Sequence, residues 1–333
     1  MEVAVQKTFK KLIKLIHKKS DFEKINISPI LKAKYNKKLK DVEDEQLKEV
    51  VEDYIANHFF LFLKGCLYIF DREEISKDAN FQTNDDDYKY SGKFQINTSL
   101  SIKGFSRIIS VSIEDHGVET EDSDSLTSSI YGDWEVTPNI SNFNQYTGDV
   151  LINGTFKGAE HSHIVFDNDY KIELLVEGLK NDSTHPSWAE YLIDGYLELK
   201  NGNDKNAFLN LFASTDYLIN YLHELIFEFH LKQISSQGIN DDLKKKIRLF
   251  SNTRQRLQDK LINIGKELNI DVKRMNCYKR WVEYTSIRDK IAHGGKFVCS
   301  YDLEDVLIDI ITLIMTLLSG TNIEEKGWRE IVK

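Results

Sequence analysis

The sequence predicts an α+β protein, and the spacing of apolar residues along its 333 positions carries that prediction. Residues 1–70 and 184–333 place apolar side chains at helical spacing, whereas residues 71–183 show short alternating runs that are typical of strands. We therefore expect an N-terminal helical segment, an acidic antiparallel β-rich middle and a C-terminal all-α helical bundle. A chain of this length, with 41% hydrophobic residues, can form two or three packed domains.

The N-terminal segment begins with a basic amphipathic pattern. Residues 3–19 place lysines opposite an apolar face, and residues 44–70 continue as a second helical pattern. A basic amphipathic helix can lie on a membrane surface, but a helix packed on its own domain is the interpretation that we prefer. The apolar-rich segments 54–70 and 306–318 are too short or too interrupted by charge to span a bilayer, so we expect no membrane partner.

The cysteines point to a reducing compartment. Cys66, Cys277 and Cys299 are far apart, and no CxxC pair indicates a zinc ribbon or a disulfide framework. The N-terminus also lacks the apolar segment of a signal peptide. The sequence therefore predicts a cytoplasmic protein without a metal or a cofactor.

The β-rich middle contains four strand candidates, at residues 94–97, 109–113, 150–152 and 171–176. It also contains a weak internal echo, because residues 90–97 resemble residues 146–153. A Lys-Gly pair follows each copy, at Lys103-Gly104 and at Lys157-Gly158. We interpret the echo as two related hairpins of one antiparallel unit. The acidic stretch 114–125 is expected to be an exposed loop.

The C-terminal region predicts five helices of an antiparallel bundle. Ser187 or Thr184 could cap the first helix, and Gly238 should break the chain after the second. The fifth is apolar almost all round, which is typical of a core or an interface. The five expected ranges are 188–199, 205–234, 241–268, 275–292 and 303–318.

The net charge of −9 hides a strong segregation of charge. Residues 1–40 carry 12 Lys and Arg against 3 Asp and Glu, residues 41–183 carry 11 against 29, and residues 244–296 carry 15 against 5. The last stretch could follow an RNA backbone. The alternative is that its cations only solvate helix faces, and charge alone does not decide between the two. The candidate RNA-binding residues are Lys273, Arg274, Lys279, Arg280, Lys290 and Lys296.

The basic stretch contains the motif that carries the most chemical information. Arg288, Asp289 and His293 occur within six residues, and Gly294 and Gly295 follow. An arginine can stabilise the charge on a phosphate undergoing attack, and a histidine can transfer a proton near neutral pH. The structural alternative is an Arg288–Asp289 ion pair beside a helix that simply ends at His293 and Gly294.

This motif in a helical bundle resembles the HEPN domain family, over roughly residues 184–325. The family motif is an arginine, four to six intervening residues and a histidine, and it maps onto Arg288 and His293, with Asp289 as the polar residue after the arginine. The resemblance implies a metal-independent endoribonuclease in which a 2′-hydroxyl attacks the neighbouring phosphate. It implies that Asp289 orients one of the other two side chains. Some similar domains only bind RNA or protein, as antitoxin-like or scaffold subunits.

The spacing between Arg288 and His293 affects how an active site could be assembled from them. Residues five apart on a regular helix point roughly 140° apart, so Arg288 and His293 of one chain would not converge on one phosphate. The helix could end between them, or a second copy could supply the partners. The family pairs two domains, which implies a homodimer here.

The whole layout resembles ApeA-like anti-phage defence effectors. That resemblance implies an RNA-cleaving toxin whose residues 1–183 sense a phage-derived or protein trigger. Other candidates are weaker. His161 and His163 lack a third metal ligand, and packing explains His223 and His230 as well as chemistry does.

Overall fold

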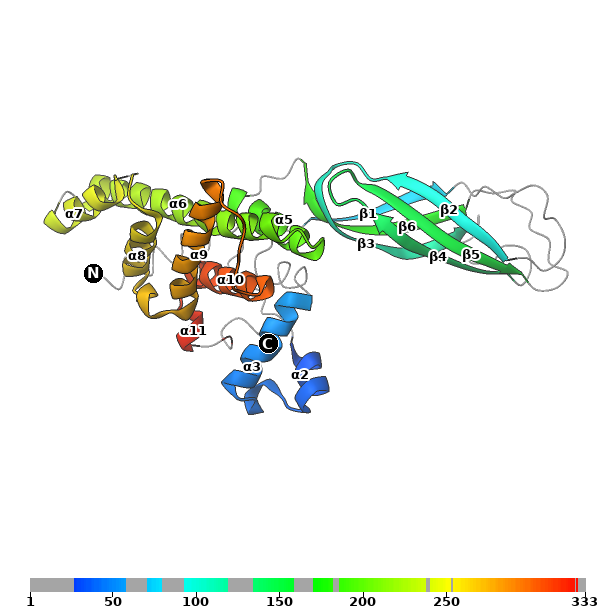
Figure 1. The fold of residues 1–333 in the computed structure, drawn as a ribbon, viewed down its shortest axis with the longest axis horizontal. Helices are drawn as coiled ribbons and strands as arrows, with labels where there is room; N and C mark the ends of the chain where they lie inside the picture. The colour runs from blue at the N-terminus through cyan, green and yellow to red at the C-terminus, as the bar shows by residue number, and fades with distance from the viewer. Residues whose placement is uncertain are drawn as a thin grey trace. The chain divides into compact units, whose positions relative to one another are not determined.

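The chain forms two units, a helical one and a β-rich one. Residue contacts join Met1–Tyr68 with His185–Lys333 into the helical unit, and Ile69–Thr184 form the β unit. The predicted α+β class is confirmed, because helices and antiparallel strands are both present. The computed structural model (Figure 1) describes residues 27–57, 71–79, 93–118, 134–158, 170–181, 186–237, 240–252, 254–326 and 328.

The sequence suggested three successive regions, and the first and the third of them belong to one unit. The described part of the first region contains α2 (Ser28–Tyr35), the short 3-10 helix η1 (Leu39–Asp41) and α3 (Asp44–Asn57). The inner face of α3 is buried through Leu47, Val50, Val51, Tyr54 and Ile55. The helix expected from residue 44 is thus confirmed as far as Asn57, while residues 3–19 and 58–70 lie outside the described residues.

The C-terminal helices follow the predicted order, and α10 forms their centre. All but four of the residues of α10 are buried, because its sequence is apolar on almost every side and neighbouring helices cover it. The placement of this helix in a core is therefore confirmed. The helices are α5 (Ser187–Lys200), α6 (Asp204–Gln237), α7 (Asp241–Phe250), α8 (Leu257–Leu268), α9 (Asn276–Ala292), α10 (Leu303–Ser319) and α11 (Ile323–Lys326), with a 3-10 turn η2 (Val272–Arg274) before α9.

Two details of these helices differ from the predictions. The single helix expected over 241–268 is two helices, α7 and α8, because the backbone N–H of Arg254 donates to the Asn252 side chain and Gln255 donates to the Leu249 carbonyl. These local bonds replace helical ones. The N-cap of the first helix is Pro186, and no side chain caps this helix end. The capping role suggested for Ser187 is therefore wrong, and Thr184 lies outside the described residues.

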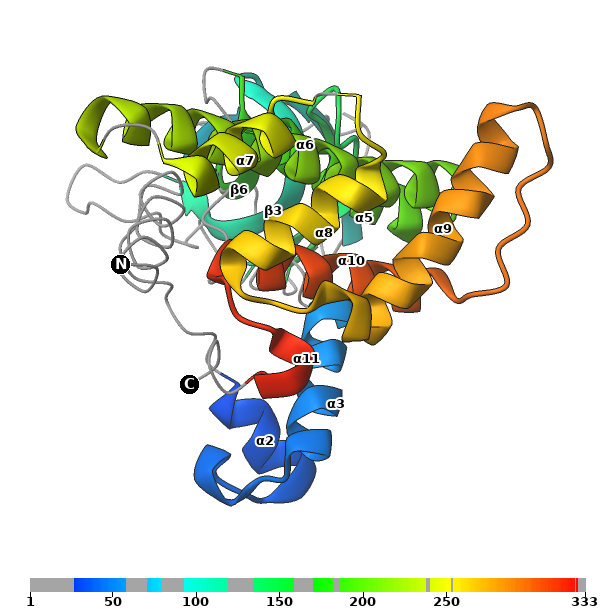
Figure 2. The ribbon, with the colours of Figure 1, turned by 90° about the vertical axis from the view of Figure 1, so that its left-hand side faces the viewer.

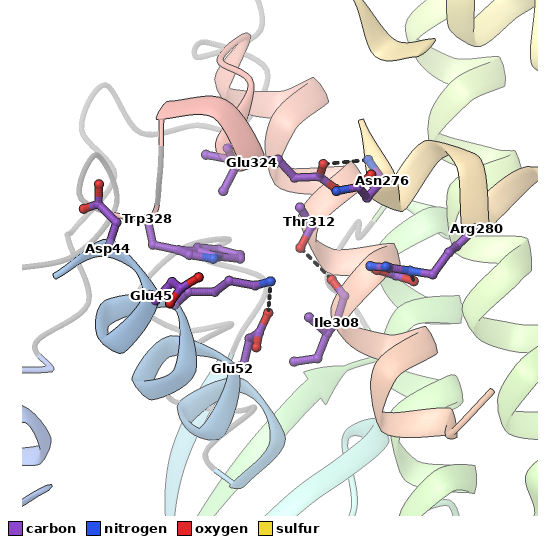
Figure 3. A pocket seen from close by; sticks show the side chains of 12 residues that line it. Asp44, Glu45, Glu52, Asn276, Arg280, Ile308, Thr312, Glu324 and Trp328 are labelled. Carbon is purple, nitrogen blue, oxygen red and sulfur yellow. Dashed lines mark hydrogen bonds and ion pairs between the residues drawn. The ribbon is translucent and has the colours of Figure 1, made fainter. Parts of the chain in front are cut away.

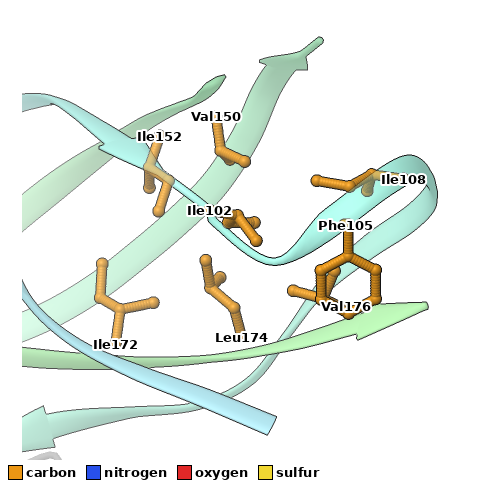
Figure 4. Packing of buried hydrophobic residues seen from close by; sticks show 8 residues of the cluster. All are labelled: Ile102, Phe105, Ile108, Val150, Ile152, Ile172, Leu174 and Val176. Atoms are coloured by element: carbon orange, nitrogen blue, oxygen red, sulfur yellow. The ribbon is translucent and has the colours of Figure 1, made fainter. Parts of the chain in front are cut away.

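The β unit consists of two three-stranded antiparallel sheets, with strand orders β1-β6-β3 and β2-β5-β4. Side chains from both sheets pack into one core, in which Ile108 of β3, Ile152 of β5 and Leu174 of β6 are buried (Figure 4). All four strand candidates lie inside observed strands. The strands are β1 (Asp71–Ala79), β2 (Lys93–Ser101), β3 (Phe105–Val118), β4 (Trp134–Phe143), β5 (Asp149–Gly158) and β6 (Tyr170–Lys180).

The interpretation of the echo as two related hairpins is wrong. The two echoed segments are neighbouring strands, since β2 pairs with β5 and Asn97 lies opposite Asn153. The chain leaves β2 through the turn at Gly104 and enters the other sheet, so β2 and β3 form no hairpin. Lys157 and Gly158 are the last two residues of β5, so they belong to a strand and not to a turn. The start of the expected acidic loop, residues 114–118, belongs to β3.

Two histidines of α6 are buried under α7. His223 is 2% exposed and His230 is 1% exposed, and the ring of Phe250 lies 4.9 Å from the first and 5.8 Å from the second. Nε2 of His230 is 3.5 Å from a carboxylate oxygen of Glu267 on α8. Burial, together with the nearby charge of Lys260, lowers the pKa of His223 to about 4. His223 is therefore neutral in the folded protein at neutral pH.

This burial predicts a specific acid sensitivity of the helical unit. Because the pKa of His223 is lower in the folded chain than the value of about 6.5 expected when unfolded, its contribution to stability is present above pH 6.5 and is lost as pH falls towards 4. The wild-type protein should lose unfolding free energy between pH 7.5 and pH 4.5. His223→Gln should lose about 2 kcal/mol less over the same range, measured by urea titration. His293→Gln, at an exposed histidine, should leave the loss unchanged, and equal losses in all three proteins would contradict the assignment.

Candidate active site

Helix α9 carries the Arg-His motif, and its other end is fixed by α11. No Gly or Pro interrupts Asn276–Ala292. The Glu324 carboxylate accepts hydrogen bonds of 2.6 Å from the backbone N–H groups of Asn276 and Cys277. This replaces the side-chain cap that Met275 at the N-cap cannot provide. The motif therefore lies at the far end of a helix whose start is anchored.

The buried face of α9 sets the rotation of the helix. The Trp281 ring stacks on Phe212 of α6, with ring centres 5.6 Å apart and planes 8° apart, and its Nε1 donates to Thr215 over 2.8 Å. On the next turn the Tyr284 hydroxyl donates to Asp309 of α10 over 2.6 Å. These contacts hold α9 beside α6 and α10, as Figure 2 shows.

Arg288 lies one turn beyond Tyr284 and has three close neighbours. Its Nη1 is 2.9 Å from Oδ1 of Asp289, and its Nη2 is 3.5 Å from Oδ2 of Asp216 on α6. The central guanidinium carbon is 5.2 Å from the centre of the Phe212 ring, which is within the range of a cation–π interaction. The side chain remains 34% exposed, so part of the guanidinium group is open to solvent.

Asp216 is the group of this site that the sequence did not reveal. Burial raises the pKa of its carboxyl group, Arg288 opposes that rise, Asp289 adds to it, and the pKa reaches about 6. A strongly shifted carboxyl group beside a half-exposed arginine is typical of functional sites, although structural ion pairs also produce it. Asp216 and Arg288 are 72 positions apart, and no spacing pattern connects them.

His293 is exposed and ends α9. It occupies the C-cap, and Gly294 follows in the left-handed conformation with φ +80°. The N–H of Gly294 donates to the Ile291 carbonyl and the N–H of Gly295 donates to the Lys290 carbonyl, which together form a Schellman motif. The double glycine therefore fixes where His293 leaves the helix.

Regular helix geometry directs the two ends of the motif away from each other within one chain. The helix is continuous from Arg288 to Ala292, so it does not end between the arginine and the histidine. Five residues of α-helix separate the two side chains by roughly 140° around the axis and by roughly 7.5 Å along it. One copy therefore presents Arg288 and His293 in different directions.

The six predicted RNA-binding residues fall into three groups. Lys290 and Lys296 are exposed on either side of His293. Lys273 and Arg274 are exposed just before α9, and Lys279 is exposed on its second turn, roughly 14 Å from Arg288 along the helix axis. The remaining residue is Arg280, which forms an ion pair with Asp309.

Nε and Nη2 of Arg280 both donate to the buried carboxylate of Asp309, while 42% of the Arg280 side chain stays exposed. Arg280 also lines a cavity of about 300 Å³ between α3, α9, α10 and α11 (Figure 3). The other basic residue of the lining, Lys48, is 3.6 Å from Glu52. Both cations of this cavity are thus paired with carboxylates, as Arg288 of the motif is. The cavity is therefore no better suited than the motif to bind a phosphate.

The remaining candidates supply no alternative centre. His161 and His163 lie outside the described residues, while His223 and His230 are buried beneath α7. In the part of the chain that the structure describes, no three His, Cys, Asp or Glu side chains gather to hold a metal ion. None of the described helices is long and apolar enough to cross a membrane.

Comparison of the chain with protein-family models, with curated proteins and with solved structures finds no match. The assignment of chemistry to this protein consequently depends on the geometry around Arg288 and His293.

The helix end at the motif yields a stability prediction. Gly294→Ala places a Cβ on a left-handed residue, so we expect the unfolding free energy to fall by about 1 kcal/mol. Gly294→Asn should cost less, because asparagine tolerates this conformation better. Thermal and urea unfolding of the three proteins would measure the difference. An alanine variant as stable as wild type would show that the left-handed cap does not form.

Proposed function

We propose that this chain is a metal-independent endoribonuclease of the HEPN type, which cleaves RNA at a composite site between two copies. The observation that supports the proposal most is the state of Arg288. It is anchored over Phe212 beside Asp216, retains solvent access, and lies on the same helix as the exposed His293. A fixed arginine with an open edge is suited to bind a phosphate in one orientation.

The proposed reaction is an internal transfer of the phosphate. One histidine removes the proton of an RNA 2′-hydroxyl, whose oxygen then bonds to the adjacent phosphorus. The bond from phosphorus to the 5′-oxygen breaks, and a second histidine donates a proton to that oxygen. Arg288 stabilises the negative charge on the phosphate oxygens during the transfer. The products are a 2′,3′-cyclic phosphate and a 5′-hydroxyl, and DNA, which lacks the 2′-hydroxyl, would not be cut.

The separation of the two side chains is the reason for proposing a homodimer. Since Arg288 and His293 of one chain point roughly 140° apart, a second copy is needed to bring the complementary groups to one phosphate. A two-fold axis beside the two α9 ends would also bring both His293 rings to one cleft, where one acts as base and the other as acid. Asp289, with an oxygen 2.9 Å from Nη1 of Arg288, would orient the arginine.

The alternative is a module that binds RNA or protein without cleaving. The observation that favours it is that Arg288 lies between two carboxylates, as in an ordinary structural ion pair. RNA binding without any cleavage would support this alternative.

For the cellular role we propose a prokaryotic defence or toxin effector acting in the cytoplasm. An endoribonuclease of this kind would harm its own host and would need restraint until infection, as in abortive infection. We propose that residues 1–183 respond to a phage-derived or protein trigger. Residues 41–183 carry 29 acidic against 11 basic residues, so that stretch is better suited to a basic partner than to RNA.

Substitution of the motif tests the proposed chemistry. We expect Arg288→Ala and His293→Ala each to lower the cleavage rate of a labelled RNA by at least roughly 100-fold, because each removes a group that acts on the reacting phosphate. EDTA should leave the wild-type rate unchanged. The matched control is Lys205→Ala, which removes an exposed cation of α6 outside the six candidate RNA-binding residues and should retain cleavage. Cleavage that survives both motif substitutions would overturn the catalytic assignment.

A mixing experiment with the same proteins tests the composite site. If one cleft needs both motifs, an equal mixture of wild type and Arg288→Ala should retain roughly a quarter of the activity of the same total wild-type protein, since a quarter of the dimers are fully wild type. Half of the activity would indicate that each chain acts alone.

A further inference from the structure

We infer that Asp216 is a positioning residue that holds the Arg288 guanidinium in the orientation required for the phosphate. The inference rests on the proposed function and extends it to a residue of another helix, outside the motif. Asp216 lies on α6 and Arg288 on α9, so the pair also joins the two helices that Phe212 and Trp281 pack together.

The Arg288–Asp216 pair contains two atoms without a hydrogen-bond partner, and these two atoms could bond to each other. In the described structure, Nε of Arg288 and Oδ1 of Asp216 are both buried and neither has a hydrogen-bond partner. One is a donor and the other an acceptor, and their partner atoms Nη2 and Oδ2 are already 3.5 Å apart. Buried polar groups left unpaired are costly, so a small side-chain shift that pairs Nε and Nη2 with both carboxylate oxygens is favourable.

A two-bond pair with the Asp216 carboxylate would fix the guanidinium group and leave some of its N–H donors free. An arginine has five N–H donors, of which Asp216 would take those of Nε and one of Nη2, while the ion pair with Asp289 would engage one of Nη1. One N–H on each terminal nitrogen then remains for a phosphate. The Phe212 ring, stacked on Trp281, lies 5.2 Å below the guanidinium carbon and restricts its movement out of this plane.

The charge state of Asp216 should control how strongly it holds the Arg288 guanidinium group. The charged groups that influence this carboxyl group are Arg288 and Asp289, both on α9. Burial raises the pKa of Asp216 to about 6 in the present geometry, and hydrogen bonds from Nε and Nη2 of Arg288 to both carboxylate oxygens would lower it from there. The ionised form pairs with the Nε–H of Arg288, and the protonated form pairs with it less strongly.

Three variants test the inference. With RNA in excess, Asp216→Asn should lower kcat roughly tenfold to 100-fold and leave KM nearly unchanged, since it misplaces a group that acts in the transition state. Asp216→Glu should recover part of the loss. Combining Asp216→Asn with Arg288→Ala should add no loss beyond that of Arg288→Ala alone, because both act through the same guanidinium. Asp241→Asn, at an exposed acid of α7, is the matched control.

NMR of the arginine Nε–H groups gives a readout that needs no cleavage. In wild type, the signal that Arg288→Lys removes should shift as Asp216 titrates, with a midpoint at or below pH 6, and in Asp216→Asn that shift should be absent. A wild-type signal without this shift, or an Asp216→Asn enzyme with unchanged kcat, would overturn the inference. If wild type cleaves no RNA, the proposed function fails, whereas the NMR titration still decides whether Asp216 holds Arg288.

Discussion

The geometry of the candidate site depends on one buried carboxylate, that of Asp309 on α10. Asp309 is 2% exposed within a mostly apolar helix, and it accepts hydrogen bonds from Arg280 and from Tyr284 on successive turns of α9. A buried charge is costly unless its partners are complete, so the two donors cannot turn away without a large penalty. Asp309 therefore fixes the rotation of α9 about its own axis.

That rotation determines what the rest of α9 can present. With Trp281 and Tyr284 turned towards α6 and α10, Arg288 on the following turn lies at the edge of the packed face, where it reaches Asp216 and Phe212 and still contacts solvent. His293 comes a further turn on, at the helix end. A buried polar network at one end of the helix and a left-handed glycine at the other thus place the two motif side chains.

The sequence predicted the parts of this arrangement that depend on local pattern. Helical spacing located α9 and α10, and the double glycine correctly predicted the helix end, because these features depend on neighbouring residues. The separation of α7 from α8 was missed, since side-chain bonds of Asn252 and Gln255 interrupt a segment that contains no Pro and no Gly before Gly265. The pairing of β2 with β5 and the contact of Asp216 with Arg288 were missed because they join distant segments.

The nature of the cleaved RNA ends tests the central claim most directly. An oligonucleotide cut by the wild-type protein should yield a 5′ fragment that ends in a 2′,3′-cyclic phosphate and a 3′ fragment that begins with a 5′-hydroxyl, as mass spectrometry would show. Placing a 2′-O-methyl group at the cleaved nucleotide should prevent the cut. Fragments with a 3′-hydroxyl and a 5′-phosphate, or cutting at the methylated position, would contradict an attack by the 2′-hydroxyl and with it the roles given to Arg288 and His293.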